Sequence, residues 1–191
     1  MTALERLLGD LAGGDEARAE AALSQLVDMG QATIPGLRDL SRSTDPDVRW
    51  WAVRGLATLP FTPAEWLVPF LNDPAAEVRQ CAALGLAGKP DEGAVDSLVR
   101  ALSDDDSMTA SLASNALIKA SSAAVPSLIE AVKHGKASQR IHALRALAEI
   151  RDHRAIPVMM NVMQEDSALL QHWAQEGLEQ LGLDMVYIKP L

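Results

Sequence analysis

Apolar and small residues recur along the chain every 30 or 31 residues, and this recurrence is the main structural signal in the sequence. Alanine occupies one column six times, at Ala22, Ala52, Ala82, Ala113, Ala143 and Ala174. A leucine follows four residues after each, at Leu26, Leu56, Leu86, Leu117, Leu147 and Leu178. Three residues after each alanine the residue is small in five of six cases: Gln25, Gly55, Gly85, Ala116, Ala146 and Gly177.

These three columns indicate one face of a helix that is repeated six times. Positions i, i+3 and i+4 lie together on a helix, small residues let a neighbouring backbone approach, and the leucine fills the remaining space. Asp45-Pro46 and Asp73-Pro74 predict where two of these helices begin, because an acidic N-cap often precedes a proline at the first helical position. Asp15 and Asp166 are the predicted caps of the first and last helices.

A second helix is predicted in each repeat. Its last apolar column reads Leu40, Leu71, Leu102, Val132 and Met163, and the column three residues earlier reads Leu37, Val68, Val99, Ile129 and Met160. Both columns are expected to be buried. Proline near the entry, as in Ile34-Pro35 and Val125-Pro126, is tolerated because the first helical turn does not need its N–H.

The predicted fold is therefore all-α, an α-α superhelix of the HEAT-like solenoid kind with about six helix pairs, in one domain spanning residues 1–191. Residues 1–13 form an N-terminal cap helix that ends at Gly13-Gly14, and residues 14–181 form the repeats. Residues 182–191 form a C-terminal cap or tail, in which Val186, Tyr187 and Ile188 are expected to cover the last repeat.

The run Asp45-Pro46-Asp47-Val48-Arg49, followed by Ala52, Gly55 and Leu56, resembles the signature of HEAT repeats. The short period and the Ala-Val-Pro entry to the second helix resemble the bacterial type found in phycobilisome lyase subunits. The resemblance implies that the second helices line a concave side. It also implies that Arg49, Arg79 and Arg140 each join an acidic residue of the next turn in a structural ladder.

Composition narrows the function. The formal net charge of -9 disfavours nucleic acid and anionic membrane surfaces, since both attract basic proteins. No apolar run approaches the length of a membrane span, and the first residues lack the basic start of a secretory signal. Cys81 is the only cysteine, which excludes an intrachain disulfide and favours a reducing cytoplasm.

The sequence carries no recognisable catalytic motif. The sequence has no phosphate-binding loop, no nucleophile elbow, and no His-Glu pair among its four histidines. We therefore expect no enzyme activity, no cofactor and no metal site. Cys81 shares a column with Trp51 and is expected to be a buried, inert thiol.

The predicted outward positions of the second helices are mostly small or polar, so Trp66 stands out among them. Arg38 and Arg100 flank it one repeat away on each side, and tryptophan is enriched at binding hot spots. Arg38, Trp66 and Arg100 are therefore the predicted centre of a partner-binding patch; the alternative is that Trp66 packs between layers. Trp50 is a second candidate contact.

The sequence thus favours a non-catalytic protein-binding scaffold or adaptor, with another protein as its partner and a monomer as the favoured state. Two alternatives stay open. One is an accessory subunit for enzyme or chromophore chemistry, which the resemblance to bilin lyase subunits implies. The other is a small-molecule binder that uses the groove near Trp66.

Overall fold

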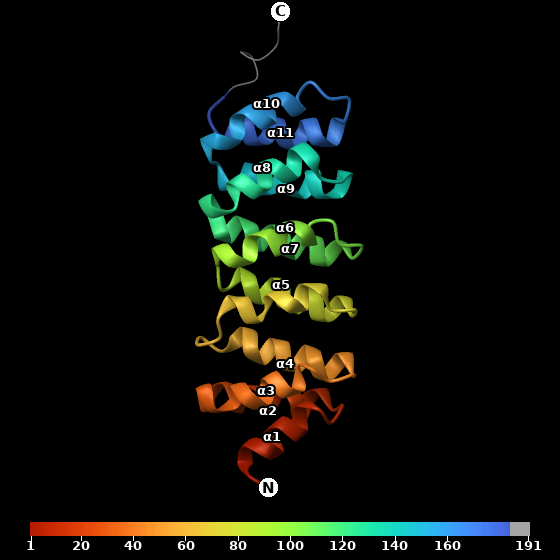
Figure 1. The fold of residues 1–191 in the computed structure, drawn as a ribbon, viewed down its shortest axis with the longest axis vertical. Helices are drawn as coiled ribbons and strands as arrows, with labels where there is room; N and C mark the ends of the chain where they lie inside the picture. The colour runs from red at the N-terminus through yellow and green to blue at the C-terminus, as the bar shows by residue number, and fades with distance from the viewer. Residues whose placement is uncertain (184–191) are drawn as a thin grey trace, which may run out of the picture. The chain divides into compact units, whose positions relative to one another are not determined.

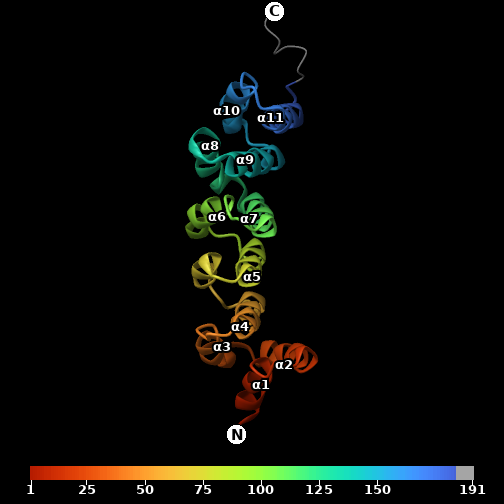
Figure 2. The same ribbon diagram turned by 90° about the vertical axis from the view of Figure 1, so that its right-hand side faces the viewer.

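The computed structural model describes residues 1–183, and all regular secondary structure in these residues is helical, which confirms the predicted all-α class (Figure 1). The chain divides into two compact units, residues 1–89 and 90–191. Each unit stacks helix pairs, so that one layer holds the first helices of the repeats and a second layer holds the second helices (Figure 2). The predicted single domain and its boundaries stay a prediction.

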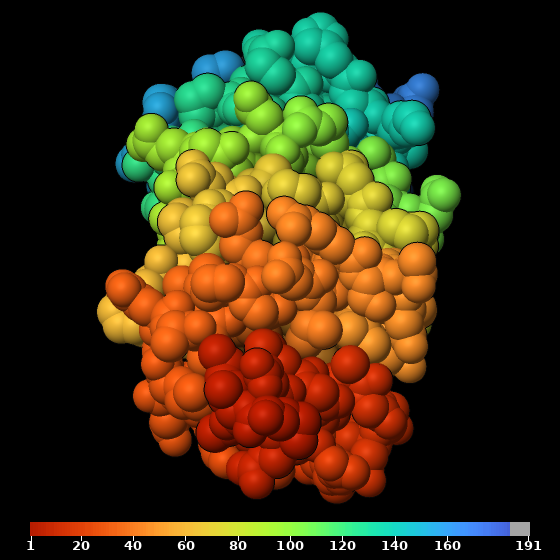
Figure 3. Space-filling model, turned by 60° about the horizontal axis from the view of Figure 1, so that its bottom comes forward, coloured from red at the N-terminus to blue at the C-terminus, as the bar shows by residue number. Residues whose placement is uncertain are grey.

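The first unit pairs long first helices with short second elements. Its helices are α1 (Ala3–Leu11), α2 (Glu16–Met29), α3 (Ile34–Leu40), α4 (Pro46–Thr58) and α5 (Ala76–Ala87), with 3-10 helices η1 (Gly30–Thr33), η2 (Ala64–Trp66) and η3 (Val68–Asn72). Helices α2, α4 and α5 pack side by side, and α1 packs on α2 as the predicted cap helix. Figure 3 shows the side chains of α1, in red, at the end of this unit.

The second unit is more regular, because the second member of each of its helix pairs is a 3-10 turn followed by an α-helix. Its helices are α6 (Val95–Ala101), α7 (Ser107–Ala120), α8 (Val125–His134), α9 (Ala137–Ile150), α10 (Ile156–Val162) and α11 (Ala168–Gln180), with 3-10 helices η4 (Glu92–Ala94), η5 (Ser121–Ala123) and η6 (His153–Ala155). Helices α7, α9 and α11 pack in one layer, and α8 contacts both α6 and α10 in the other.

The repeated alanines and leucines form the core, as predicted. All twelve members of the two columns, from Ala22 to Leu178, have at most 1% of their surface exposed. The small residue between them permits a close approach of helices. A methyl group added at Gly85 would lie 2.7 Å from the Cβ of Ala57, closer than two carbon atoms pack.

Most helix starts follow the sequence, with two corrections. Asp15, Asp45 and Asp106 cap α2, α4 and α7 through their side chains. Asp73 is not an N-cap, because α5 begins after Ala75 and the Asp73 carboxylate is bound by Arg49 instead. The cap of α11 is Ser167 rather than Asp166.

The register of the second layer also needs a correction. The side chains of Leu67, Leu98, Leu128 and Met159 are buried there, with at most 2% exposed. The predicted column one residue later, Val68, Val99, Ile129 and Met160, is only half-buried or exposed. Leu37, the member of the predicted column in the first repeat, is buried as predicted, with 1% exposed. In the other four repeats both neighbours are apolar, so the pattern alone could not separate them.

Arg49 and Arg140 of the predicted ladder each bind a carboxylate of the following turn. Arg49 donates to Asp73 from Nε and Nη2, at 2.8 and 2.7 Å, and both side chains are largely buried. Arg140 donates from Nη2 to both oxygens of Glu165, at 2.6 and 2.8 Å, in a more exposed setting. Arg79 donates from Nη1 to the backbone carbonyls of Asp73 and Pro74.

Two further expectations concern the ends of the chain and the membrane. The predicted cover by Val186, Tyr187 and Ile188 lies outside the described residues. Among residues 1–183, no helix combines the length and the apolar character that a membrane crossing requires.

Candidate binding surfaces

Arg38 and Trp66 meet on the second layer of the first unit. Arg38 projects from α3 and Trp66 ends η2, and the guanidinium carbon of Arg38 lies 4.6 Å from the centroid of the Trp66 ring. This distance is within the range of a cation–π contact. Trp66 is half-buried, so one part of its ring packs on the unit and another part faces solvent.

A small pocket of about 260 Å³ opens beside this contact. Leu56, Trp66, Pro69 and Phe70 supply its apolar surface, and Arg38, Arg42, Ser41 and Glu65 supply its polar groups. The rim therefore carries two guanidinium groups and one carboxylate. Arg42 is bound to Asp39 at 3.2 Å, which leaves Arg38 as the cation nearest to the indole. Such a pocket suits a flat apolar group that carries an anion.

A proline accounts for the irregular local structure at Trp66. Pro69 lies two residues after the buried Leu67, where the second helices of the other repeats continue, and it has no N–H for a helical hydrogen bond. The segment consequently forms two short 3-10 helices where the other repeats form an α-helix. Trp66 is the last residue of the first of these two 3-10 helices.

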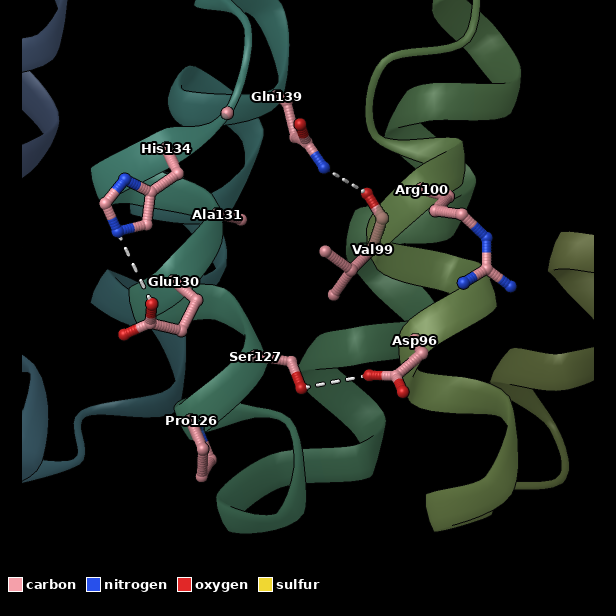
Figure 4. A pocket seen from close by; sticks show the side chains of 10 residues that line it. Asp96, Val99, Arg100, Pro126, Ser127, Glu130, Ala131, His134 and Gln139 are labelled. Atoms are coloured by element: carbon pink, nitrogen blue, oxygen red, sulfur yellow. Dashed lines mark hydrogen bonds and ion pairs between the residues drawn. The ribbon is translucent and has the colours of Figure 1, made fainter.

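Arg100 belongs to the second unit and lies on α6, where its Nη2 donates to Ser97 Oγ at 2.7 Å. It lines a groove of about 500 Å³ between α6 and α8 (Figure 4). The hydrogen bond from Ser127 to Asp96 crosses this groove, and so does the one from Gln139 to the carbonyl of Val99. The predicted association of Arg100 with Arg38 and Trp66 stays a prediction.

The carboxylates at the Figure 4 groove already have partners. Asp96 accepts from Ser127 at 3.1 Å, and Glu130 accepts from Lys133 at 2.9 Å with His134 at 3.6 Å. The hydrogen bond from Lys133 lowers the pKa of Glu130. This groove therefore presents balanced charge rather than a site for one sign of ligand.

Trp50 lies on α4 and is half-buried, as expected. Its ring meets the buried ring of Trp51 edge-on at 4.8 Å, and the guanidinium carbon of Arg54 lies 5.2 Å from each ring centroid. Both rings also line a pocket of about 570 Å³. Sequence reasoning flagged Trp50 but missed its acidic neighbours Glu16 and Asp47, which come from two different repeats.

Cys81 is half-buried, and burial raises the pKa of its thiol to about 11. The sequence predicted a fully buried thiol, but the side chain is only half-buried. A thiol with that pKa is protonated at neutral pH and is a poor nucleophile. Among the described residues, no group of three or more histidine, cysteine or acidic side chains is placed to hold a metal ion.

The sequence pattern of HEAT repeats matches residues 64–122 and 110–179, which together make up more than half of the chain. The chain belongs to the HEAT-repeat family. Its HEAT-like fold, predicted from the repeated columns, is thereby confirmed.

A curated relative, the bilin biosynthesis protein RpcF of Synechococcus sp. (strain WH8020), is 33% identical to the chain over 91 residues. The match covers 47% of this chain and 44% of the relative, so the chain spans less than half the length of the protein it matches. This match supports the resemblance to lyase subunits that the repeat period implied.

Solved structures share the fold. The complex of CpcE and CpcF of phycocyanin lyase from Nostoc sp. PCC7120 aligns with a TM-score of 0.59 at 20% identity, covering 75% of this chain and 97% of that chain. A designed armadillo repeat protein in complex with the peptide (KR)4 aligns with a TM-score of 0.51 at 19% identity, covering 94% of this chain and all of that chain.

These relatives correct one expectation. The absence of a catalytic motif led us to expect that the chain is not an enzyme, and the expectation is wrong. The named relatives are a bilin biosynthesis protein and a phycocyanin lyase. The physical reason is that motif searches detect compact constellations, whereas a repeat protein spreads its functional residues over several helices.

Proposed function

We propose that this chain is a subunit of a bilin lyase-type enzyme. Its HEAT repeats bind an open-chain tetrapyrrole, and the subunit acts together with a second protein chain. The observation that carries the proposal is the 33% identity over 91 residues to a bilin biosynthesis protein. This favours the accessory-subunit alternative over a purely non-catalytic adaptor.

The Arg38–Trp66 pocket is the proposed contact with the pigment. A bilin is a conjugated, largely flat molecule that carries carboxylate groups. Trp66 and Phe70 offer aromatic surface, and Arg38 offers a guanidinium at the rim of the same pocket. Arginine binds carboxylates through paired N–H donors, so one side chain can orient the acid while the indole holds the ring system.

The test is a titration of the purified chain with biliverdin, followed by absorbance of the pigment in the visible range. Binding should shift and sharpen the pigment's long-wavelength band, because a fixed conformation replaces many in solution. Trp66→Leu and Arg38→Ala should each weaken the binding about tenfold, as loss of one central contact does. Trp50→Leu, on another surface of the same unit, is the matched control and should bind as the wild type does.

An unchanged pigment spectrum at saturating biliverdin would overturn the proposal. Equal binding by the wild type and by both the Trp66→Leu and Arg38→Ala variants would leave a pigment site but remove Trp66 and Arg38 from it. The Figure 4 groove with Arg100 is then the next surface to test, by Arg100→Ala.

The adaptor function that the sequence favoured is part of the same proposal, because a lyase-type subunit works through contact with other proteins. Two solved structures of similar fold are complexes, one with a second chain and one with a peptide. We expect affinity purification from the native host to recover one protein partner. The cytoplasmic location and the monomeric state of the isolated chain stay predictions, the latter to be checked by light scattering.

A further inference from the structure

The pocket beside Trp50 and Trp51 lies on the first unit, away from the Arg38–Trp66 contact, and has no part in the proposed pigment binding. It opens between the first turns of α2 and α4. Its lining is Leu11, Ala12, Gly13, Gly14, Glu16, Asp45, Asp47, Val48, Trp50 and Trp51. Two indole rings and three aliphatic side chains thus form its apolar surface, and three carboxylates provide its charge.

Two of the three carboxylates are uncompensated. Glu16 and Asp47 are exposed, and neither side chain has a hydrogen bond or ion pair with another described residue. The carboxylate of Asp45 has a partner, because its Oδ1 accepts a hydrogen bond from the N–H of Asp47 and so caps α4. No lysine, arginine or histidine is among the residues that line the pocket. The pocket therefore attracts a cation, in contrast with the balanced Figure 4 groove.

The same indoles already accept a guanidinium within the protein. Arg54 lies 5.2 Å from the centroids of both Trp50 and Trp51, and Glu20 binds its Nη2 at 2.9 Å. This internal contact combines two rings, one guanidinium and one carboxylate. The pocket offers the same rings together with two carboxylates that lack a partner.

We propose that this pocket binds an arginine side chain from an exposed segment of a partner protein. The guanidinium pairs with Glu16 and Asp47, and its flat face lies against the indole of Trp50. The aliphatic stem of the arginine packs against Val48 and Leu11. Arginine fits better than lysine because its planar group both stacks on aromatic rings and donates to two carboxylates. This site is a protein contact and does not depend on the proposed bilin function.

The test follows the indole N–H signals of the four tryptophans by NMR, assigned with single Trp→Phe variants. The full chain is titrated with Ac-Ala-Arg-Ala-NH2 in the millimolar range, and the matched ligand is the citrulline peptide, which has the same shape without the charge. The Trp50 and Trp51 signals should shift with the arginine peptide and not with the citrulline peptide. The signals of Trp66 and Trp173 should not move.

Charge variants provide the second measurement. Glu16→Gln combined with Asp47→Asn should weaken binding of the arginine peptide about fivefold or more, since each exposed ion pair contributes up to about 1 kcal/mol, a factor of about five. Asp28→Asn, an exposed acid near the end of α2, removes a charge elsewhere in the same unit and should leave the affinity within twofold. Asp45 is left unchanged because it caps α4.

Three outcomes would overturn the proposal. They are the absence of shifts at Trp50 and Trp51, equal shifts with the citrulline peptide, and equal weakening by Asp28→Asn and the double variant. A chain that binds biliverdin but shows one of these outcomes retains its proposed function and loses only this site.

Discussion

The two units contain the same repeat but differ in regularity and in chemistry. In the second unit, the second member of each helix pair is an α-helix, and the groove on the surface of this unit has balanced charge. In the first unit, η2 and η3 replace one α-helix, and Trp50, Trp51 and Trp66 are all located there. Departures from a regular pattern are often found at functional sites. The tryptophans of both proposed binding sites therefore lie in the first unit, whereas the second unit has the more regular repeats.

The ladder of ion pairs offers the sharpest test of this comparison. The exposed fractions of the Arg49 and Asp73 side chains are 12% and 6%, whereas those of Arg140 and Glu165 are 22% and 39%. Removal of one partner from a buried pair leaves an uncompensated charge and costs about 3–5 kcal/mol, whereas an exposed pair contributes about 0–1 kcal/mol. Asp73→Ala should therefore lower the free energy of unfolding far more than Glu165→Ala, as measured by urea denaturation. Equal losses would contradict the difference in burial.

Close helix contacts give the second test, with one glycine from each unit. In Gly85→Ala the new methyl group meets Ala57 Cβ at 2.7 Å, and this atom cannot move without its backbone. We expect a net loss of about 1–2 kcal/mol, because the strain exceeds the gain in helix propensity. In Gly177→Ala the nearest atom, at 2.5 Å, is the terminal methyl of Met159, which can rotate away.

The stability of Gly177→Ala should consequently stay within about 0.5 kcal/mol of the wild type. Gly9→Ala is the control for helix propensity alone, since no atom lies within 4 Å of the added methyl group. It should be slightly stabilising. A stabilised Gly85→Ala variant would show that the contact with Ala57 relaxes more readily than the structure indicates.

The sequence predicted the first layer well and the second layer less well, for a physical reason. In the first layer, alanine and leucine recur at helical spacing, four residues apart, so the buried face of each helix is clear from the sequence. In the second layer, adjacent apolar pairs such as Leu98-Val99 and Leu128-Ile129 satisfy either register, and only contact with the first layer decides between them. Hydrophobic pattern cannot resolve such a choice.

Of the two candidate binding surfaces on the first unit, one was predicted from the sequence and the other was not. Trp66 was predicted because it departs from its column, and its contact with Arg38 follows from the stacking of neighbouring repeats. The pocket of Glu16, Asp47 and Trp50 was missed, because its residues come from different columns of two repeats. A signal was present, since Glu16 and Asp47 both lie in the first turn of a first-layer helix.

Acid should weaken the first unit's ladder through Asp73. Burial alone raises the pKa of this carboxyl, but the hydrogen bonds from Arg49 and from the Ala75 N–H outweigh it and lower the pKa below the usual value. The stabilising contribution is therefore fully present above about pH 4 and is lost as the pH falls through the lowered pKa. The melting temperature of the wild type should fall more steeply than that of Asp73→Asn in this acidic range. Parallel curves for the two proteins would contradict this assignment.

The smallest expected effect compares the two exposed arginines that flank Trp66 in the sequence. Arg38 lies over the Trp66 ring at 4.6 Å, and an exposed cation–π contact contributes about 0.5–1 kcal/mol. Arg100 is exposed and its side chain donates to Ser97 Oγ, so Arg100→Ala should change the stability by less than about 0.5 kcal/mol. Urea denaturation of Arg38→Ala and Arg100→Ala measures both effects. If Arg38→Ala costs no more than Arg100→Ala, the guanidinium does not hold the Trp66 ring in solution. Arg38 would then be free to pair with an incoming anion, and biliverdin binding should still weaken in this variant even though its stability does not change.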